Sequence, residues 1–145
     1  NSPSNSLILQ ADGQKLPFKD NFFDAVLLDV PCSSTGTLHK NPDIKWVDSE
    51  KNLLRHQILQ KNLLNEGARV LHPKGVMVYA TCSLEPEENE LQVKEFLEKH
   101  PTFSLNSTSK NPPYELSIEV LIEEKKFKLL PDGNQGGFFA VAFSK

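Results

Sequence analysis

The sequence predicts a doubly wound α/β domain, in which a mostly parallel sheet presents its functional groups along one edge. One observation is the order of patterns along the chain, which is strand, strand, helix, strand, helix and a late pair of strands. A second is that an aspartate or a cysteine follows each early strand. Open α/β sheets bind ligands at the carboxyl ends of their strands, so we expect the site at that edge.

Short apolar runs mark the predicted strands. We expect Ser6–Ala11 to form a short buried strand. Phe23–Asp29 should form a second strand, and its continuous apolar centre predicts cover on both faces of the sheet. A third strand is expected at Val76–Ala80, and the closing pair at 127–130 and 138–143.

Apolar residues at three- and four-residue steps mark two helices. The first begins at Asp48 or Ser49, either of which can cap it, and runs to about Leu71. The second begins near Pro86 and ends before Pro101. The expected inward faces are Leu54, Ile58, Leu64, Ala68 and Leu71 in the first helix, and Leu91, Phe96 and Leu97 in the second.

Four acids surround the start of the second helix, where a negative charge complements the helix dipole. We interpret them as solvated side chains of a well-started helix: Glu85, Glu87, Glu88 and Glu90. The segment 36–47 is expected to be irregular, and the pattern of 102–124 is too weak for a prediction.

Composition narrows the class of protein. A net charge of −3 provides no broad basic field, and such a field supplies most of the non-specific affinity for nucleic acid. Hydrophobic content of 38% and charged content of 24% are ordinary for a soluble globular protein. No apolar run is long enough to cross a bilayer. The first six residues have neither the basic flank nor the apolar core of a secretion signal, so we expect a cytoplasmic protein.

The chain contains two cysteines, and each follows a predicted strand. Cys32 lies in the sequence DVPCSSTG (29–36), and Cys82 lies in ATCS (80–83). Their wide spacing argues against a zinc site, and lasting disulfides are rare in the cytosol. A right-handed crossover would make their strands parallel and adjacent, about 5 Å apart. Cys32 and Cys82 should therefore meet at one edge of the sheet, together with Asp12 and Asp29.

Two thiols at one edge suggest covalent chemistry on a pyrimidine. A thiolate is a strong nucleophile, and the dipole of the helix predicted after Cys82 would help to ionise it. Methylation at carbon-5 of cytosine needs such a group, because the carbon becomes nucleophilic only after a thiolate adds to carbon-6. A second group must then assist release. For either cysteine alone, a buried and inert thiol remains the alternative interpretation.

Three stretches carry a resemblance to a known family. They are the DVPCSSTG stretch (29–36), NPDIKW (41–46) and YATCSLEPEEN (79–89). Together they resemble the Nop/Sun (RsmB-like) family of RNA 5-methylcytosine methyltransferases. The resemblance covers nearly the whole chain, from about Asp12 to Phe139. It implies a Rossmann-like class I methyltransferase fold with an antiparallel final strand, S-adenosylmethionine as cofactor, and RNA rather than DNA as substrate, with ribosomal RNA expected.

The resemblance also implies a role for each matching residue. Cys82 matches the nucleophile, and Cys32 matches the cysteine that assists product release, as a base or through an activated water. Asp29 matches an acid that hydrogen-bonds the target ring or the amino acid end of the cofactor. Asp12 matches an acid whose segment contacts the adenine of the cofactor, and a helix-cap or turn aspartate is the equal alternative for this residue.

The sequence departs from the family pattern in three places. Val30 stands where alanine is common, and the stretch QGGFF (135–139) lacks the aspartate that often precedes Gly-Phe-Phe. No glycine-rich cofactor turn precedes Asp12. We therefore expect residues 1–145 to be the C-terminal portion of a single catalytic domain whose N-terminal strands are missing. In isolation it should have little activity and bind the cofactor weakly.

Competing interpretations can be tested against the fold. The sequence NPPY (111–114) imitates a motif of amino-group methyltransferases, but it lies away from any predicted strand end. A non-catalytic α/β interaction module would have structural thiols. A thiol hydrolase would need a histidine base, and none is expected beside Cys82 among His39, His56, His72 and His100. Lys40, Lys45 and Trp46 could contact RNA, although solvated lysines and a packed tryptophan are at least as well supported by the sequence.

Overall fold

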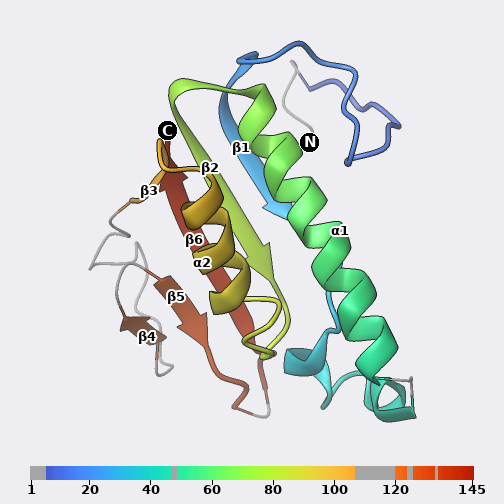
Figure 1. Cartoon of the computed structure of the whole chain (residues 1–145). Helices are drawn as coiled ribbons and strands as arrows, with labels where there is room; N and C mark the ends of the chain where they lie inside the picture. The colour runs from blue at the N-terminus through green and yellow to red at the C-terminus, as the bar shows by residue number, and fades with distance from the viewer. Residues whose placement is uncertain (1–5, 47–48, 107–119, 124–125, 133) are drawn as a thin grey trace.

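The fold is organised around a mixed sheet with two helices on one of its faces. In the computed structural model, residues 6–46, 49–106, 120–123, 126–132 and 134–145 are described. Strands β1 (Phe23–Asp29) and β2 (Leu71–Thr81) flank α1 (Ser49–Val70) in the chain. The later elements are α2 (Glu90–Lys99), β3 (Ser104–Leu105), β4 (Val120–Glu123), β5 (Lys126–Leu129) and β6 (Phe138–Ser144). Figure 1 shows α1 and α2 lying side by side across the strands.

The strand order is β1-β2-β6-β5-β4, with β3 also paired to β6. β1 and β2 are parallel and adjacent, as expected, and their register places Asp29 opposite Ala80. From β2 onward every described pair is antiparallel, including the predicted closing pair β5 and β6. The sheet is therefore parallel where the two cysteine loops leave it and antiparallel at the other side.

Helix α1 occupies the predicted range, but its buried face differs from the expected one. Leu64 and Ala68 are buried, whereas Leu54 and Ile58 are 55% and 63% exposed. The expected stripe contained a six-residue step from Ile58 to Leu64, and six residues leave a helix about a third of a circle short of two full turns. The face that packs on the sheet instead begins at Gln60, four residues before Leu64.

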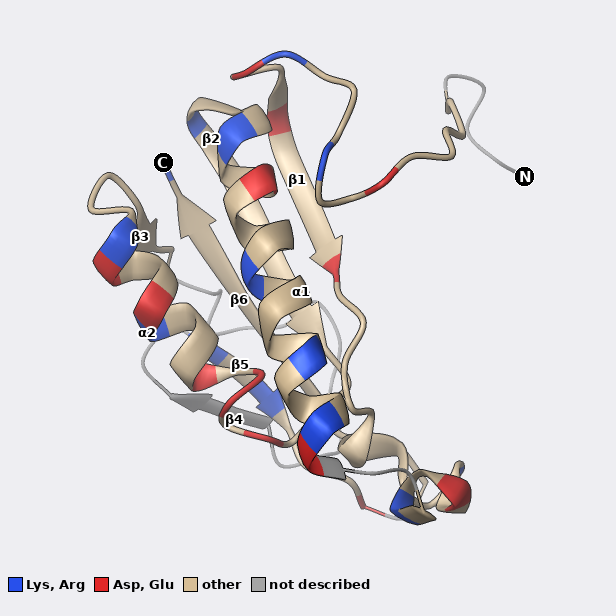
Figure 2. Ribbon diagram, turned by 45° about the vertical axis from the view of Figure 1, so that its right-hand side comes forward, with Lys and Arg blue, Asp and Glu red and all other residues tan. Residues whose placement is uncertain are grey.

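Strand β1 is covered on one face only by the described residues. Leu28 packs against the core beneath α1, whereas Leu27, its neighbour in the strand, is 71% exposed. The prediction of cover on both faces was wrong for this strand, because α1 and α2 lie on the same side of the sheet (Figures 1 and 2). Alternating side chains of a strand point to opposite faces, so only one set is buried.

The expected first strand at Ser6–Ala11 does not form. These residues have no regular secondary structure, and Ile8 is 95% exposed. Among the described residues β1 pairs with β2 alone, so its outer edge carries no strand. An apolar run becomes a strand only where a ladder partner satisfies its backbone and a packed layer covers its side chains.

Helix α2 begins four residues later than expected, at Glu90 rather than Pro86. Gln92, Val93 and Phe96 form its buried face, while Leu91 is 52% exposed and so does not belong to the inward stripe. The core between the helices and the sheet is formed by Val30, Leu64, Ala68, Leu71, Met77, Tyr79, Val93, Phe96, Phe103, Phe139, Val141 and Phe143.

Neither described helix has the length and apolarity that a bilayer crossing would need. In the same residues no three histidine, cysteine or acidic side chains gather in a way that could hold a metal ion.

Candidate functional site

The two cysteines lie together at the carboxyl ends of β1 and β2. The pairing of these strands continues past β1, since the Val30 N–H donates to the Ala80 carbonyl at 3.1 Å. The next residues turn inward, and Cys32 Sγ lies 3.2 Å from Cys82 Sγ. Both thiols are free and partly exposed. We call the two loops that carry them, residues 30–37 and 82–89, the cysteine rim.

Ser34 brings a hydroxyl to both sulfurs. Its Oγ lies 4.0 Å from Cys32 Sγ and 3.4 Å from Cys82 Sγ. Its backbone is left-handed, with φ at 59°, a conformation that costs a non-glycine residue free energy. Such residues cluster at functional sites, where the surrounding structure maintains them.

Gly36 joins three loops through its backbone. Its N–H donates to the Cys82 carbonyl at 3.0 Å, and its own carbonyl accepts from Gly137 N–H at 2.7 Å. A Cβ at this position would stand 2.6 Å from the Cys82 carbonyl oxygen. Thr35 adds a contact, because its Oγ1 accepts from Leu84 N–H at 3.0 Å. The rim therefore depends on a close backbone approach that glycine alone allows.

The two thiols have opposite ionisation tendencies. The pKa of Cys82 is lowered from 9.0 to about 6, chiefly by the hydrogen bond from the Cys32 thiol and further by Ser34. Asp29 opposes this shift and raises the pKa of Cys82 by its negative charge. The pKa of Cys32 is raised, first by its hydrogen bond to Cys82 and then by burial. These opposite shifts favour a Cys82 thiolate beside a protonated Cys32.

The cause of this thiolate differs from the one expected. The dipole of the following helix was expected to help ionise Cys82, but α2 starts eight residues later, at Glu90. Dipole effects fall off within the first turn of a helix, so the neighbouring thiol is the larger influence.

The loop after Cys82 is held by buried polar side chains. The Thr81 hydroxyl donates to Asn89 Oδ1 at 2.6 Å, and Asn89 Nδ2 donates to the Ser83 carbonyl at 2.9 Å. All three side chains are fully buried. Buried polar groups that satisfy one another fix a loop in one conformation.

Glu88 corrects the expectation that the acids before α2 are solvated. Its side chain is 0% exposed, and its carboxylate accepts hydrogen bonds from the Ser33 backbone N–H at 2.9 and 3.1 Å. The Ser33 hydroxyl and Gln60 Nε2 also donate to it, at 2.5 and 3.0 Å. This acid links the rim to α1 and is no part of a solvated helix start.

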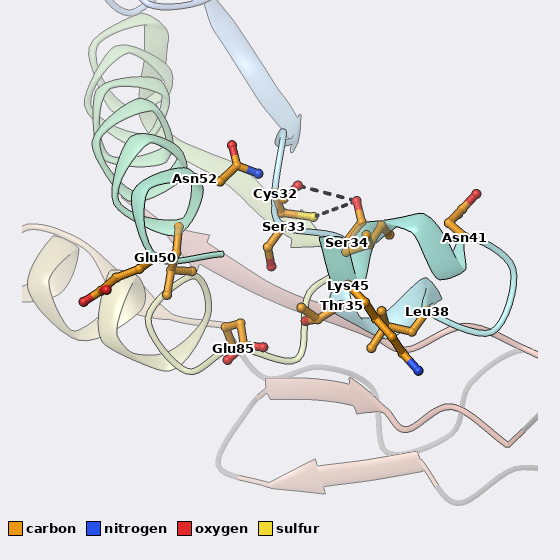
Figure 3. A pocket seen from close by; sticks show the side chains of 12 residues that line it. Cys32, Ser33, Ser34, Thr35, Leu38, Asn41, Lys45, Glu50, Asn52 and Glu85 are labelled. Carbon is orange, nitrogen blue, oxygen red and sulfur yellow. Dashed lines mark hydrogen bonds between the residues drawn. The ribbon is translucent and has the colours of Figure 1, made fainter. Parts of the chain in front are cut away.

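A pocket of about 780 Å³ opens beside Cys32. Figure 3 shows the cysteine loop on one side, the segment of Asn41 and Lys45 on a second, and the start of α1 on a third. Cys32, Ser33, Ser34, Thr35, Leu38, Asn41, Ile44, Lys45, Glu50, Asn52, Leu53 and Glu85 line it. Its volume is within the range of pockets that hold small molecules or single residues of a larger ligand.

The two predicted acids lie in different surroundings. Asp29 is exposed at the end of β1, close enough to Cys82 to affect its pKa. Asp12 lies at no strand end, because the strand expected before it is absent. Its carboxylate accepts from Gln14 N–H at 2.9 Å in a turn, and that segment packs on the middle of α1. The structure does not bring Asp12 to the cysteine rim.

The other candidate residues surround the rim at greater distance. His56 approaches it most directly, with Nδ1 3.5 Å from Glu88 Oε1, and no described contact joins a histidine to either sulfur. Trp46 is 88% exposed, so the interpretation of a packed tryptophan was wrong. Lys45 lines the pocket beside Cys32. The NPPY sequence (111–114) lies outside the described residues.

Sequence reasoning missed three residues that shape the site: Ser34, Gln60 and Glu88. Ser34 was adjacent to a recognised cysteine, and its contact depends on an unusual backbone angle that the sequence does not reveal. Gln60 stands on the inward face of α1, where a buried amide signals a specific partner. Glu88 was hidden among neighbouring acids of similar pattern.

Comparisons with known proteins agree with this geometry. A sequence profile of the family described as 16S rRNA methyltransferase RsmB/F matches residues 2–144. The ribosomal RNA small subunit methyltransferase B of Klebsiella pneumoniae (strain 342) is 44% identical over 86 residues, which are 59% of this chain and 20% of that protein. Its counterpart from Salmonella agona (strain SL483) is 38% identical over 124 residues, 85% of this chain and 26% of that protein.

Two solved structures from Pyrococcus horikoshii share the fold. NSun6, determined with SFG, has a TM-score of 0.75 at 26% identity and covers 98% of this chain and 35% of that one. A methyltransferase homologue has a TM-score of 0.59 at 34% identity, covering 86% of this chain and 39% of that one. The chain spans about a quarter of the length of these curated relatives.

Proposed function

We propose that this chain, which belongs to the RsmB/F family of 16S rRNA methyltransferases, carries the two thiols that methylate carbon-5 of a cytosine in RNA. The observation that carries the proposal is the 3.2 Å separation of Cys32 Sγ and Cys82 Sγ, with the pKa of Cys82 lowered to about 6. A thiolate beside a protonated thiol at a strand edge is the pairing that addition and release require.

Cys82 is the proposed nucleophile. Its thiolate adds to carbon-6 of the cytosine, forming a carbon–sulfur bond and moving the ring electrons toward carbon-5. S-adenosylmethionine, when bound, supplies the methyl group that carbon-5 takes up. The target base must leave its stack to meet the sulfur from the face of the ring.

Cys32 is the proposed release group. Its hydrogen bond to Cys82 is the main cause of its raised pKa, and that cause disappears once Cys82 is bonded to carbon. Cys32 can then ionise and take the proton from carbon-5, directly or through a water. The electrons of that carbon–hydrogen bond restore the ring double bond, and the Cys82–carbon bond breaks.

Asp29 fits the chemistry of the cofactor side of the site. It is an exposed carboxylate at the same strand edge as the thiols, and such a group can accept hydrogen bonds from an amino group or a ring N–H. Asp12 is also proposed to contact the cofactor, through the adenine. The relative determined with SFG, an S-adenosylmethionine analogue, supports this cofactor class.

The proposed RNA contacts include Lys45 and Trp46. Lys45 lines the pocket beside Cys32, and the ring of Trp46 is exposed next to it in the chain, where it could stack on a base. Acidic and basic positions are interspersed along both helices (Figure 2), which favours local contacts over a broad basic surface. Small-subunit ribosomal RNA is the proposed substrate, from the names of the relatives.

We also propose that these 145 residues are the C-terminal portion of a longer catalytic domain and have little activity alone. The test therefore uses the longer protein that contains this chain, with RNA and labelled S-adenosylmethionine. Cys32→Ala should accumulate a covalent protein–RNA adduct, because addition proceeds and release fails. Cys82→Ala should form none. Adduct in Cys82→Ala but not in Cys32→Ala would show that the two roles are reversed, and full activity of Cys82→Ala would favour a non-catalytic module.

A further inference from the structure

The buried carboxylate of Glu88 is fully committed to hydrogen bonds at the cysteine rim. Burying a charge costs free energy unless donors surround it. Both carboxylate oxygens accept from the Ser33 N–H, and the Ser33 hydroxyl donates to Oε2. Ser33 follows Cys32 directly, so Glu88 fixes the backbone on the C-terminal side of that cysteine.

Gln60 fixes the other side. Its side chain on α1 is 0% exposed, and its Nε2 donates to the Pro31 carbonyl at 2.9 Å and to Glu88 Oε1 at 3.0 Å. These two bonds use both hydrogens of the amide. Cys32 is therefore held between two anchored neighbours, Pro31 and Ser33, by a side-chain pair that is itself hydrogen-bonded.

Glu88 also belongs to the loop that carries Cys82. The hydroxyl of Tyr79, a buried residue of β2, donates to the Glu88 carbonyl at 2.6 Å and ties this loop to the strand. Glu88 thus holds the Cys32 loop through its side chain, while its backbone is part of the Cys82 loop.

We propose that Glu88 is a positioning residue that keeps Cys32 Sγ within hydrogen-bond reach of Cys82 Sγ. It touches neither sulfur and acts through Ser33 and Gln60. The inference rests on the proposed roles of the two thiols. A carboxylate suits this place because every group hydrogen-bonded to it, the Ser33 N–H and hydroxyl and Gln60 Nε2, is a donor, and an amide there would turn its own NH₂ against them.

If Glu88 only supported the fold, replacing it would lower stability but leave the ionisation of Cys82 unchanged. The pH dependence of Cys82 alkylation therefore separates the two roles. Other titratable groups face the same region. His56 on α1 and Tyr79 on β2 face Glu88, and Asp29 at the end of β1 raises the pKa of Cys82. The variant His56→Gln is therefore included, to show that the profile does not report the histidine.

The experiment follows alkylation of Cys32 and Cys82 by iodoacetamide from pH 5 to 10 in the longer protein that contains this chain, with peptide mass spectrometry to separate the two cysteines. The unsubstituted protein should show a Cys82 midpoint near 6. Glu88→Gln should raise this midpoint by about one unit or more, because the donor from Cys32 is displaced. The matched control is Glu87→Gln, since Glu87 has no hydrogen bond or ion pair with a described residue, and its midpoint should not move.

If Glu88→Gln folds, as judged by circular dichroism, and keeps the low Cys82 midpoint, the positioning role of Glu88 is overturned and the proposed function is not. If that variant does not fold, Ser33→Ala decides, because it removes one donor to Glu88 and leaves the backbone N–H. It should shift the midpoint upward by a smaller amount, and an unchanged profile overturns the proposal. An ordinary midpoint in the unsubstituted protein would instead count against Cys82 as the nucleophile, and thereby against the proposed function itself.

Discussion

The cysteine rim and the N-terminal stretch 6–22 are organised in opposite ways. The rim contains few apolar residues, yet hydrogen bonds from several segments hold it, as Glu88 and Gly36 illustrate. The N-terminal stretch contains a clear apolar run, yet Ile8 is 95% exposed and the run forms no strand. The number of apolar residues therefore does not explain why the cysteine rim packs on the sheet and the run at 6–11 does not. The decisive difference is whether a segment has partners for its backbone.

Within the N-terminal stretch, the part that does pack is hydrogen-bonded to α1, where the Glu66 carboxylate accepts from Leu16 N–H at 2.7 Å. Arg69 of α1 donates to the Leu16 and Phe18 carbonyls at 3.1 and 2.8 Å and pairs with Asp20 at 2.7 Å. Residues 7–10 lie outside these contacts and are exposed. The same rule holds at both regions. A segment packs on the rest of the molecule where other segments hydrogen-bond to its backbone, and apolar residues alone do not make it pack.

Within the cysteine rim, the largest effect is expected from Gly36→Ala, at the junction of its loops. The new Cβ would stand 2.6 Å from the Cys82 carbonyl oxygen and 2.9 Å from Gly137 Cα, so the loops must separate. We expect a loss of about 1–3 kcal/mol in unfolding free energy, measured by urea denaturation, and loss of the low Cys82 midpoint. Gly136→Ala is the control, because its nearest neighbour is a side-chain atom 3.3 Å away. Equal costs for the two variants would contradict the idea of a single tight junction.

A smaller change is expected from Cys32→Ala, which removes one donor and leaves the loops in place. The pKa of Cys82 is held at about 6 mainly by the Cys32 thiol, so the alkylation midpoint should rise by about two units toward that of an ordinary thiol. A lowered pKa means that the unsubstituted Cys82 is reactive above pH 6, and the variant should become reactive only at alkaline pH. Adduct trapping in Cys32→Ala is therefore best carried out above pH 8. A midpoint that stays near 6 would point to a different origin of the thiolate.

The smallest effect is expected in the N-terminal stretch. Ile8→Ala should change the unfolding free energy of this chain by less than about 0.5 kcal/mol, because an exposed side chain loses no packing. Leu64→Ala is the matched comparison, since Leu64 is 1% exposed, and it should cost about 2–5 kcal/mol. Both values come from the same urea titration. A cost for Ile8→Ala as large as that for Leu64→Ala would mean that the stretch packs in solution.

The sequence by itself determined the two cysteines, the order of β1, α1 and β2, and the family. These depend on local patterns: an apolar run before each thiol, helical spacing in 49–70 and motifs read residue by residue. The parallel pairing of β1 and β2 followed from the crossover between them, and so the meeting of Cys32 and Cys82 could be predicted before their 3.2 Å contact was seen.

The tertiary structure alone decided which apolar residues are covered and which acid is buried. Leu27 and Leu28 are equivalent in sequence, but the helices lie on one face, so only Leu28 packs. Glu88 and Glu87 are neighbours of the same type, but only Glu88 meets donors from Ser33 and Gln60. Burial and charge compensation depend on segments distant in the chain, and no local pattern encodes their positions.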